Sequence, residues 1–289
     1  MKKYFLCLLL FVKMTLVVFG QSYVMIPDVN FRTVLKSKYP SCFNNIDELD
    51  FTCAEITMEI ELDVSGNGIT DLTGIDYFKS LRILNCSSNE LIILNDLPES
   101  LITLNCSQNQ IQQVLALPDG LIELICSNNK LVGMPALPAN LKVLVCFNNL
   151  ILLLPDLPLR ITGLNVENNR LSVLPAIPKS VIKLYCSKNA LTVLPELPLT
   201  LQYLFCDRNQ LNALPVLSPN LTILTCHTNN LTELPSLPVA LNYLDCSSNK
   251  LKTIPELPPL LRYFNGSENP LEKKPVNKHP DVLKFFILE

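Results

Sequence analysis

The sequence predicts a solenoid of short stacked coils, with a parallel β-sheet on the concave face and extended, polyproline-like chain on the convex side. Three observations predict this fold. From Leu81 onward the chain repeats every 20 residues without an insertion, the ninth residue of each repeat is Asn, and most of the 22 prolines fall at two repeat positions. A chain of 289 residues is long for one hydrophobic core, and stacked repeats accommodate that length by growing in one direction.

The repeat reads L-x-x-L-x-C-x-x-N-x-L-x-x-L-P-x-L-P-x-x. Its 20-residue copies begin at Leu81, Leu101, Leu121, Leu141, Ile161, Val181, Leu201, Leu221, Leu241 and Leu261, and a longer copy begins at Glu59. Positions 4 and 6 are both apolar, and alternate residues share one face of a strand, so each coil is expected to contribute one parallel strand. A single coil cannot bury its own apolar residues. We therefore expect positions 1, 4, 6, 11, 14 and 17 to form a continuous core between neighbouring coils.

The invariant Asn column is expected to be structural. It includes Asn89, Asn109, Asn129, Asn149, Asn169, Asn189, Asn209, Asn229 and Asn249, with Asn67 before and Asn269 after them. Each Asn falls where the chain leaves the strand, so a buried amide there can satisfy backbone groups that the turn leaves unpaired, including those of the adjacent coil. The column therefore predicts a hydrogen-bonded Asn ladder along the solenoid.

The pattern resembles the leucine-rich-repeat signature L-x-x-L-x-L-x-x-N-x-L over residues 59–275. With Pro at positions 15 and 18, it is similar to the short L-P-x-L-P repeats of bacterial effector proteins. The stretch 26–31, followed by 62–65 and 84–89, also resembles the opening of surface leucine-rich-repeat proteins of Bacteroidetes-type bacteria. Because Pro lacks an amide hydrogen and excludes helix, the convex side is expected to be extended. The resemblance implies a rigid scaffold that recognises another molecule.

The first 20 residues predict a signal peptide. Lys2 and Lys3 precede two short apolar runs separated by Lys13, a composition typical of secretory signals, with cleavage expected near Gly20. A membrane anchor is the alternative, but each run is far shorter than the roughly 20 residues of a spanning helix. We expect an exported protein, whether secreted, displayed on the cell surface or periplasmic, without a transmembrane anchor after cleavage.

Three regions are expected to follow the signal peptide. Residues 21–58 should form an N-terminal cap, 59–280 a solenoid of eleven coils, and 281–289 a C-terminal cap over the last coil. In the N-terminal cap, Pro27 and Asp28 offer a helix start. The apolar stripe of this helix is expected to comprise Val29, Phe31, Val34 and Leu35.

Eight cysteines occupy repeat position 6: Cys86, Cys106, Cys126, Cys146, Cys186, Cys206, Cys226 and Cys246. A single file on parallel strands cannot surround a metal ion, and Val166 replaces Cys in one coil, so we expect small buried hydrophobic residues with reduced thiols and no metal site. Cys42 and Cys53 lie in the predicted cap instead. In an exported protein they form either a loop-closing disulfide or two buried thiols.

Function is expected on the outward strand positions 3, 5 and 7, since folding dictates the core and turn columns. These positions carry an apolar and aromatic strip, which we take as the candidate ligand-binding surface: Ile125, Val145, Phe147, Tyr185, Tyr203, Phe205, Ile223, His227, Tyr243 and Tyr263. Exposed aromatic residues grouped on one face commonly mark recognition anchors. The alternative is that neighbouring rings only stack along the ladder and stabilise the sheet.

No enzyme is expected. The chain has two histidines, His227 and His279, without a Ser, Cys or Asp at a spacing that suggests a catalytic triad, and nothing in it predicts a cofactor. A net charge of -3 does not suit a nucleic-acid partner. The sequence therefore favours an exported recognition or adhesion module that binds a protein, such as a host protein, or a surface glycan. The alternative is a periplasmic or envelope structural protein that acts by self-association.

Overall fold

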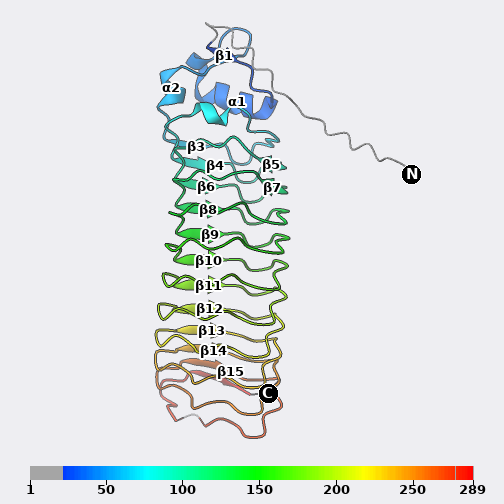
Figure 1. Cartoon of the computed structure of the whole chain (residues 1–289), viewed down its shortest axis with the longest axis vertical. Coiled ribbons are helices and arrows are strands. Elements are labelled where there is room, and N and C mark those ends of the chain that lie inside the picture. Colours follow the sequence, from blue (N-terminus) through cyan, green and yellow to red (C-terminus); the bar gives the residue numbers. More distant parts are fainter. Residues whose placement is uncertain (1–21, 277, 289) are drawn as a thin grey trace, which may run out of the picture.

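The computed structural model describes residues 22–276 and 278–288, and it shows an elongated solenoid (Figure 1). One strand from each coil joins a 12-stranded parallel sheet along the long axis, ordered β16-β15-β14-β13-β12-β11-β10-β9-β8-β6-β4-β3. Its strands are β3 (Glu61–Asp63), β4 (Ile83–Asn85), β6 (Thr103–Asn105), β8 (Glu123–Ile125), β9 (Val143–Val145), β10 (Gly163–Asn165), β11 (Lys183–Tyr185), β12 (Tyr203–Phe205), β13 (Ile223–Thr225), β14 (Tyr243–Asp245), β15 (Tyr263–Asn265) and β16 (Phe285–Ile287). The predicted fold class is confirmed.

The pairing register follows the repeat. Leu164 of β10 aligns with Leu144 of β9 and with Leu184 of β11, so each repeat position lies beside the same position of the next coil. Side chains at position 4 point into the core, while positions 3 and 5 point outward because successive residues of a strand face opposite sides. This register turns each repeat position into a column that runs the length of the solenoid.

The core is a stack of apolar columns. The leucines of positions 1, 4 and 11 are buried, and the eight cysteines of position 6 are buried and free, as expected. The column lapses at Val166, which is equally buried, and at Gly266. A Cβ atom on Gly266 would lie 2.6 Å from the ring of Phe264, so Gly there accommodates a phenylalanine at position 4, where other coils have leucine.

A turn in the left-handed region follows each strand of the 20-residue repeats, at repeat position 8. Ten non-glycine residues adopt φ between 51° and 56° there, from Ser88 to Glu268, and they include Lys188, Arg208 and Thr228. This conformation costs an L-residue about 1–2 kcal/mol. Because these residues differ so much in chemistry, the turn before the invariant Asn has no signature in the sequence.

The convex side differs from the expectation in the first coils. There β5 (Ile93–Leu94) and β7 (Gln113–Val114) pair as a two-stranded parallel sheet, and the Leu115 amide donates to the Leu94 carbonyl at 3.0 Å. Leu115 occupies position 15, where Pro stands from Pro135 onward. Since Pro has no amide hydrogen, this hydrogen bond cannot form in the later coils, and their described convex segments have no regular secondary structure.

The N-terminal region contains the short helical elements α1 (Val29–Lys38), η1 (Pro40–Cys42), α2 (Ala54–Thr57) and η2 (Ile75–Tyr77), and the antiparallel strands β1 (Tyr23–Val24) and β2 (Leu49–Asp50). The Asp28 side chain caps α1 by accepting from the Phe31 amide at 2.8 Å. Phe31 and Leu35 are buried, but Val29 is exposed, so its assignment to the buried stripe was wrong. Cys42 and Cys53 form a disulfide that ties η1 to the start of α2.

At the other end, β16 adds to β15 as the last strand of the sheet, and Phe285, Phe286 and Ile287 are exposed along it. Residues 278–288 therefore lie against the last repeat coil. The predicted signal peptide lies outside the described residues. In the part of the chain that the structure describes, no helix has the length and apolar character needed to cross a bilayer.

Candidate functional site

The predicted binding residues all lie on the outward face of the 12-stranded sheet or in the turn directly after a strand. They form two columns on the sheet, at positions 3 and 5, and Phe147 and His227 begin a third at position 7. None of the ten is fully exposed, because each packs against the same position of neighbouring coils. The sheet face is therefore a surface of half-buried apolar side chains, more protected than the sequence suggested.

The aromatic rings of this face stack on one another. Tyr185 and Phe205 lie 4.8 Å apart between ring centroids with a 17° angle between their planes, and Tyr243 and Tyr263 lie 4.3 Å apart at 2°. Stacking along the ladder thus occurs at both pairs and stabilises the sheet. It also fixes the rings in place, so that they present edges and hydroxyl groups, rather than flat faces, to a ligand.

One tyrosine hydroxyl of the face is held strongly in its neutral form. Burial, together with the neighbouring Tyr263 and its hydrogen bond, raises the pKa of Tyr243 to about 12. At neutral pH this phenol keeps its proton and is able to donate a hydrogen bond.

A polar cluster lies beside the aromatic columns. Asp207 accepts hydrogen bonds from the hydroxyl groups of Ser187 at 2.6 Å and Thr225 at 2.8 Å, and His227 Nε2 lies 3.4 Å from its other carboxylate oxygen. The serine hydroxyl contacts the carboxylate and not the imidazole, so the three residues lack the nucleophile–base order of a catalytic triad. Asp207 instead fixes the orientation of His227 at the rim of the face.

A hollow interrupts the sheet face at β10. Gly163 occupies position 3, where the neighbouring coils have Val143 and Lys183, and the missing side chain leaves an open hollow of about 430 Å³. Val145, Tyr185 and Thr162 also line it. A Cβ atom built on Gly163 would meet nothing within 4 Å, so the hollow is not filled from a neighbouring coil.

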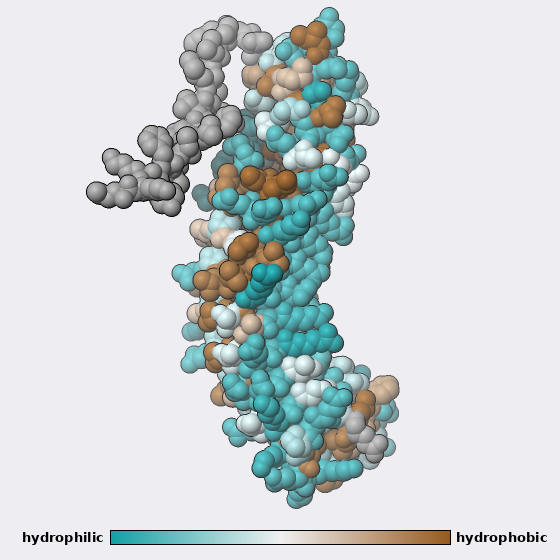
Figure 2. Space-filling model, turned by 90° about the vertical axis from the view of Figure 1, so that its right-hand side faces the viewer, coloured by the Kyte–Doolittle hydropathy of each residue, from teal (hydrophilic) through white to brown (hydrophobic). Residues whose placement is uncertain are grey.

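Sequence reasoning missed the most exposed apolar side chains. Leu159 and Val216 are 84% and 81% exposed, and Leu199 and Val239 are each 70% exposed, all on the descending segments at repeat positions 16 and 19. Ile93 and Leu153 are exposed on the convex side, where Figure 2 shows separate hydrophobic patches on a largely hydrophilic surface. The available signal was apolar residues at positions that the repeat leaves variable.

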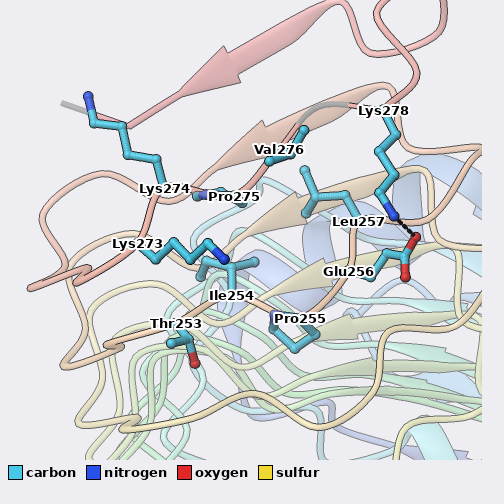
Figure 3. A pocket seen from close by; sticks show the side chains of 10 residues that line it. All are labelled: Thr253, Ile254, Pro255, Glu256, Leu257, Lys273, Lys274, Pro275, Val276 and Lys278. Atoms are coloured by element: carbon cyan, nitrogen blue, oxygen red, sulfur yellow. Dashed lines mark hydrogen bonds and ion pairs between the residues drawn. The ribbon is translucent and has the colours of Figure 1, made fainter.

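A smaller hollow of about 210 Å³ lies on the convex side of the last coils (Figure 3). Pro255, Leu257 and Val276 line it together with three lysines. Lys278 is paired with Glu256 at 2.6 Å, and the close-up shows the Lys274 ammonium pointing away from the other lining groups. The hollow thus lacks a set of convergent charged groups, and it contains none of the predicted site residues.

The Asn ladder and the cysteine column lie beneath the sheet face. In a middle coil, Asn149 Nδ2 donates to the carbonyl groups of Cys126 at 3.0 Å and Cys146 at 3.1 Å, while its Oδ1 accepts from the Leu131 amide at 3.0 Å. Each Asn thus joins its own coil to the preceding one.

Burial raises the pKa of the described ladder thiols for which a shift is resolved, such as Cys186 and Cys206, so these thiols are neutral. Among the described residues, the one group with metal-ligand spacing is Cys42, Cys53 and Glu55, and the disulfide occupies both of its sulfur atoms.

Solved structures share this geometry. YopM from Yersinia enterocolitica is 38% identical over 79% of this chain and 51% of its own, with a TM-score of 0.77. The functional domain of InlJ from Listeria monocytogenes, which includes a cysteine ladder, is 27% identical over 86% of this chain and 52% of its own, with a TM-score of 0.59. The chain is a leucine-rich-repeat protein. It spans about half the length of these two structures.

A leucine-rich effector protein, YopM from Yersinia pestis, matches this leucine-rich-repeat protein at 26% identity over 73% of this chain and 78% of its own, with a TM-score of 0.54. No protein-family model and no curated protein match the chain. The neighbours are bacterial effector and surface proteins, which supports a protein-binding module. The resemblance to Bacteroidetes-type surface proteins stays a prediction.

Proposed function

We propose that this leucine-rich-repeat protein is an exported recognition module that binds a protein partner along the outward face of its sheet. The observation that carries the proposal is the strip of apolar and aromatic side chains from Ile125 to Tyr263, which the register aligns over eight consecutive strands. At about 4.8 Å per strand, the full sheet of twelve strands is roughly 50 Å long, which is enough for a protein domain or an extended peptide.

The ring geometry favours a protein over a glycan. Sugars commonly bind flat against an aromatic ring, but in the pairs Tyr185–Phe205 and Tyr243–Tyr263 each ring covers a face of the other. What remains accessible is a row of ring edges, tyrosine hydroxyl groups and aliphatic side chains. Such a surface suits the mixed apolar and hydrogen-bonding side chains of a protein partner.

Export is supported by the disulfide between Cys42 and Cys53. Disulfides form and persist in oxidising compartments outside the cytosol, and this one stabilises a small cap with a limited core. The eight ladder thiols are buried and do not oppose export, because burial protects them from oxidation.

A second candidate function is an envelope structural role through self-association. The edge strand β16 favours it, because Phe285 is 62% exposed and Phe286 and Ile287 are also exposed on it. An exposed apolar edge strand offers unpaired backbone groups to a second chain. Concentration-dependent association, measured by light scattering after size-exclusion chromatography, would separate this function from recognition of a different protein.

The test compares two surfaces of the same protein. One variant changes Tyr185, Tyr203, Phe205 and Tyr243 to Ala. Its matched control changes the exposed apolar residues of the descending segments, namely Leu159, Leu199, Val216 and Val239, to Ala. Both variants are checked for folding by circular dichroism, and captured proteins are identified by mass spectrometry from host fluid and from the source envelope.

We expect the control to retain its partners and the sheet-face variant to lose them. Capture by both variants alike, or loss only in the control, would overturn the proposed binding face. Hot-spot truncations of aromatic residues typically cost 2 kcal/mol or more each, or about a 30-fold loss of affinity, so the loss should be complete under capture conditions.

A further inference from the structure

The hollow at Gly163 is the point of the sheet face where side chains do not cover the backbone. It is open because a single coil carries Gly at position 3, and no folding requirement explains that choice. Gly163 does not adopt a positive φ, and a Cβ atom there meets nothing within 4 Å. Val143 occupies the same register position one strand away, which shows that a larger residue fits the fold. The glycine is therefore available for function rather than needed for structure.

Charges of opposite sign lie beyond the two ends of this hollow along the position-3 column. Lys183 on β11 is the next residue on one side, and it is exposed with its ammonium 5.6 Å from the centre of the Tyr203 ring. On the other side Val143 comes first and Glu123 on β8 second. Within the described part of the chain, neither Lys183 nor Glu123 takes part in an ion pair.

We propose that the hollow is a specificity pocket for an extended peptide segment of the protein partner, in which an apolar side chain enters the space over Gly163. A basic side chain of the same segment lies over Glu123, and an acidic one lies over Lys183. The inference rests on the proposed function and names the chemistry that this part of the sheet face recognises.

The spacing of the column sets the spacing in the ligand. Glu123 and Lys183 are three strands apart, or about 14 Å at 4.8 Å per strand. Four residues of an extended chain cover about 13–14 Å. The segment therefore carries its basic and acidic residues four positions apart, and the apolar residue lies between them on the same side of the peptide. Either chain direction satisfies this order.

The lining supports an apolar occupant of moderate size. Val143 and Val145 provide aliphatic walls, Tyr185 contributes a ring already stacked on Phe205, and Thr162 lies at the margin. At about 430 Å³ the open hollow has room for a leucine-sized side chain together with the peptide backbone that carries it.

The test uses a blocked heptapeptide, Ser-Lys-Ser-Leu-Ser-Glu-Ser, with a terminal fluorophore, titrated with the whole chain and followed by fluorescence anisotropy. A second peptide replaces its leucine by alanine, and a third replaces its glutamate by lysine. The variant Gly163→Val fills the hollow with the residue that the neighbouring coil already has. Gly133→Val is the matched control, since Gly133 also has open space around its Cβ position but lies on the convex side.

We expect the first peptide to bind the unmodified chain and Gly133→Val equally, and to bind Gly163→Val at least about ten-fold more weakly, because burying a leucine is worth that factor or more. The alanine peptide should lose a similar factor. Lys183→Glu should reverse the preference between the first and third peptides. Circular dichroism and thermal unfolding confirm that each variant folds.

Absence of measurable binding to the first peptide, or equal affinity for Gly163→Val, would overturn the pocket. Neither result touches the proposed function, which depends on capture of whole proteins by the aromatic strip. Conversely, loss of that capture only in the descending-segment control would overturn the binding face, whatever the peptides do.

Discussion

Replacing Asn149 by Ala tests the Asn ladder most directly. The side chain accepts from the Leu131 amide and donates to the Cys126 carbonyl, both in the preceding coil, and it also donates to two carbonyl groups of its own coil. Alanine leaves the two groups of the preceding coil buried without their partner. Each such loss costs about 1–3 kcal/mol, so the substitution should lower the free energy of unfolding by about 4 kcal/mol.

Asn67 supplies the matched control, because it is the same residue at the same repeat position in the first coil. It is exposed, and its amide donates only to the Ser65 carbonyl, at 2.7 Å, within its own coil. Asn67→Ala should cost less than about 1 kcal/mol.

Guanidinium denaturation followed by circular dichroism measures both changes. Because coils contact only their neighbours, Asn149→Ala is also expected to broaden or split the transition as the two halves of the solenoid uncouple. Equal midpoints for the two variants would refute the assignment of the ladder as the main polar connection between coils.

Two further predictions concern sulfur. Burial raises the pKa of Cys246 to about 12, against 9.0 as its ordinary value, and raises that of Cys186 further; the folded chain thus holds these protons where the unfolded chain releases them, and this stability is complete below pH 9 and declines as the pH rises toward 12, by about 1.4 kcal/mol per thiol and pH unit. Cys186→Val introduces the residue that the adjacent coil already carries at Val166, so this variant should fold and show an alkaline stability slope smaller by one thiol, measured from denaturation midpoints between pH 8 and pH 10; an unchanged slope would contradict the linkage. Replacing Cys42 and Cys53 by Ser should lower stability by about 2–3 kcal/mol through the freed loop, and treatment of the native chain with a reductant should give the same loss in calorimetry; a loss from the substitutions without one from the reductant would show that packing, and not the bridge, is responsible.

The sequence predicted the solenoid because every feature that defines it lies within one 20-residue period. Alternation of Leu84 and Cys86 predicts the strand, the Asn column predicts the turn contacts, and the prolines exclude helix on the convex side. The capped helix after Asp28 was predicted for the same reason, since capping and periodicity are local properties. Local chemistry repeated in phase leaves little choice of fold.

The properties of the candidate site depend on neighbours that are 20 residues away. Tyr243 looks like an exposed ring in the sequence, but Tyr263 covers it once the coils stack. The left-handed turn at Thr228 follows from closing a coil and not from any residue preference, and the convex pairing of β5 with β7 depends on the absence of Pro at position 15.

Gly163 shows the division most clearly. In the sequence it is one glycine at a variable repeat position, and only the register places it between Val143 and Lys183 with an open hollow above it. The sequence by itself determined which residues face inward, because burial follows the period of the repeat. The tertiary structure decided which outward residues remain accessible, because exposure depends on the size of the side chains in adjacent coils.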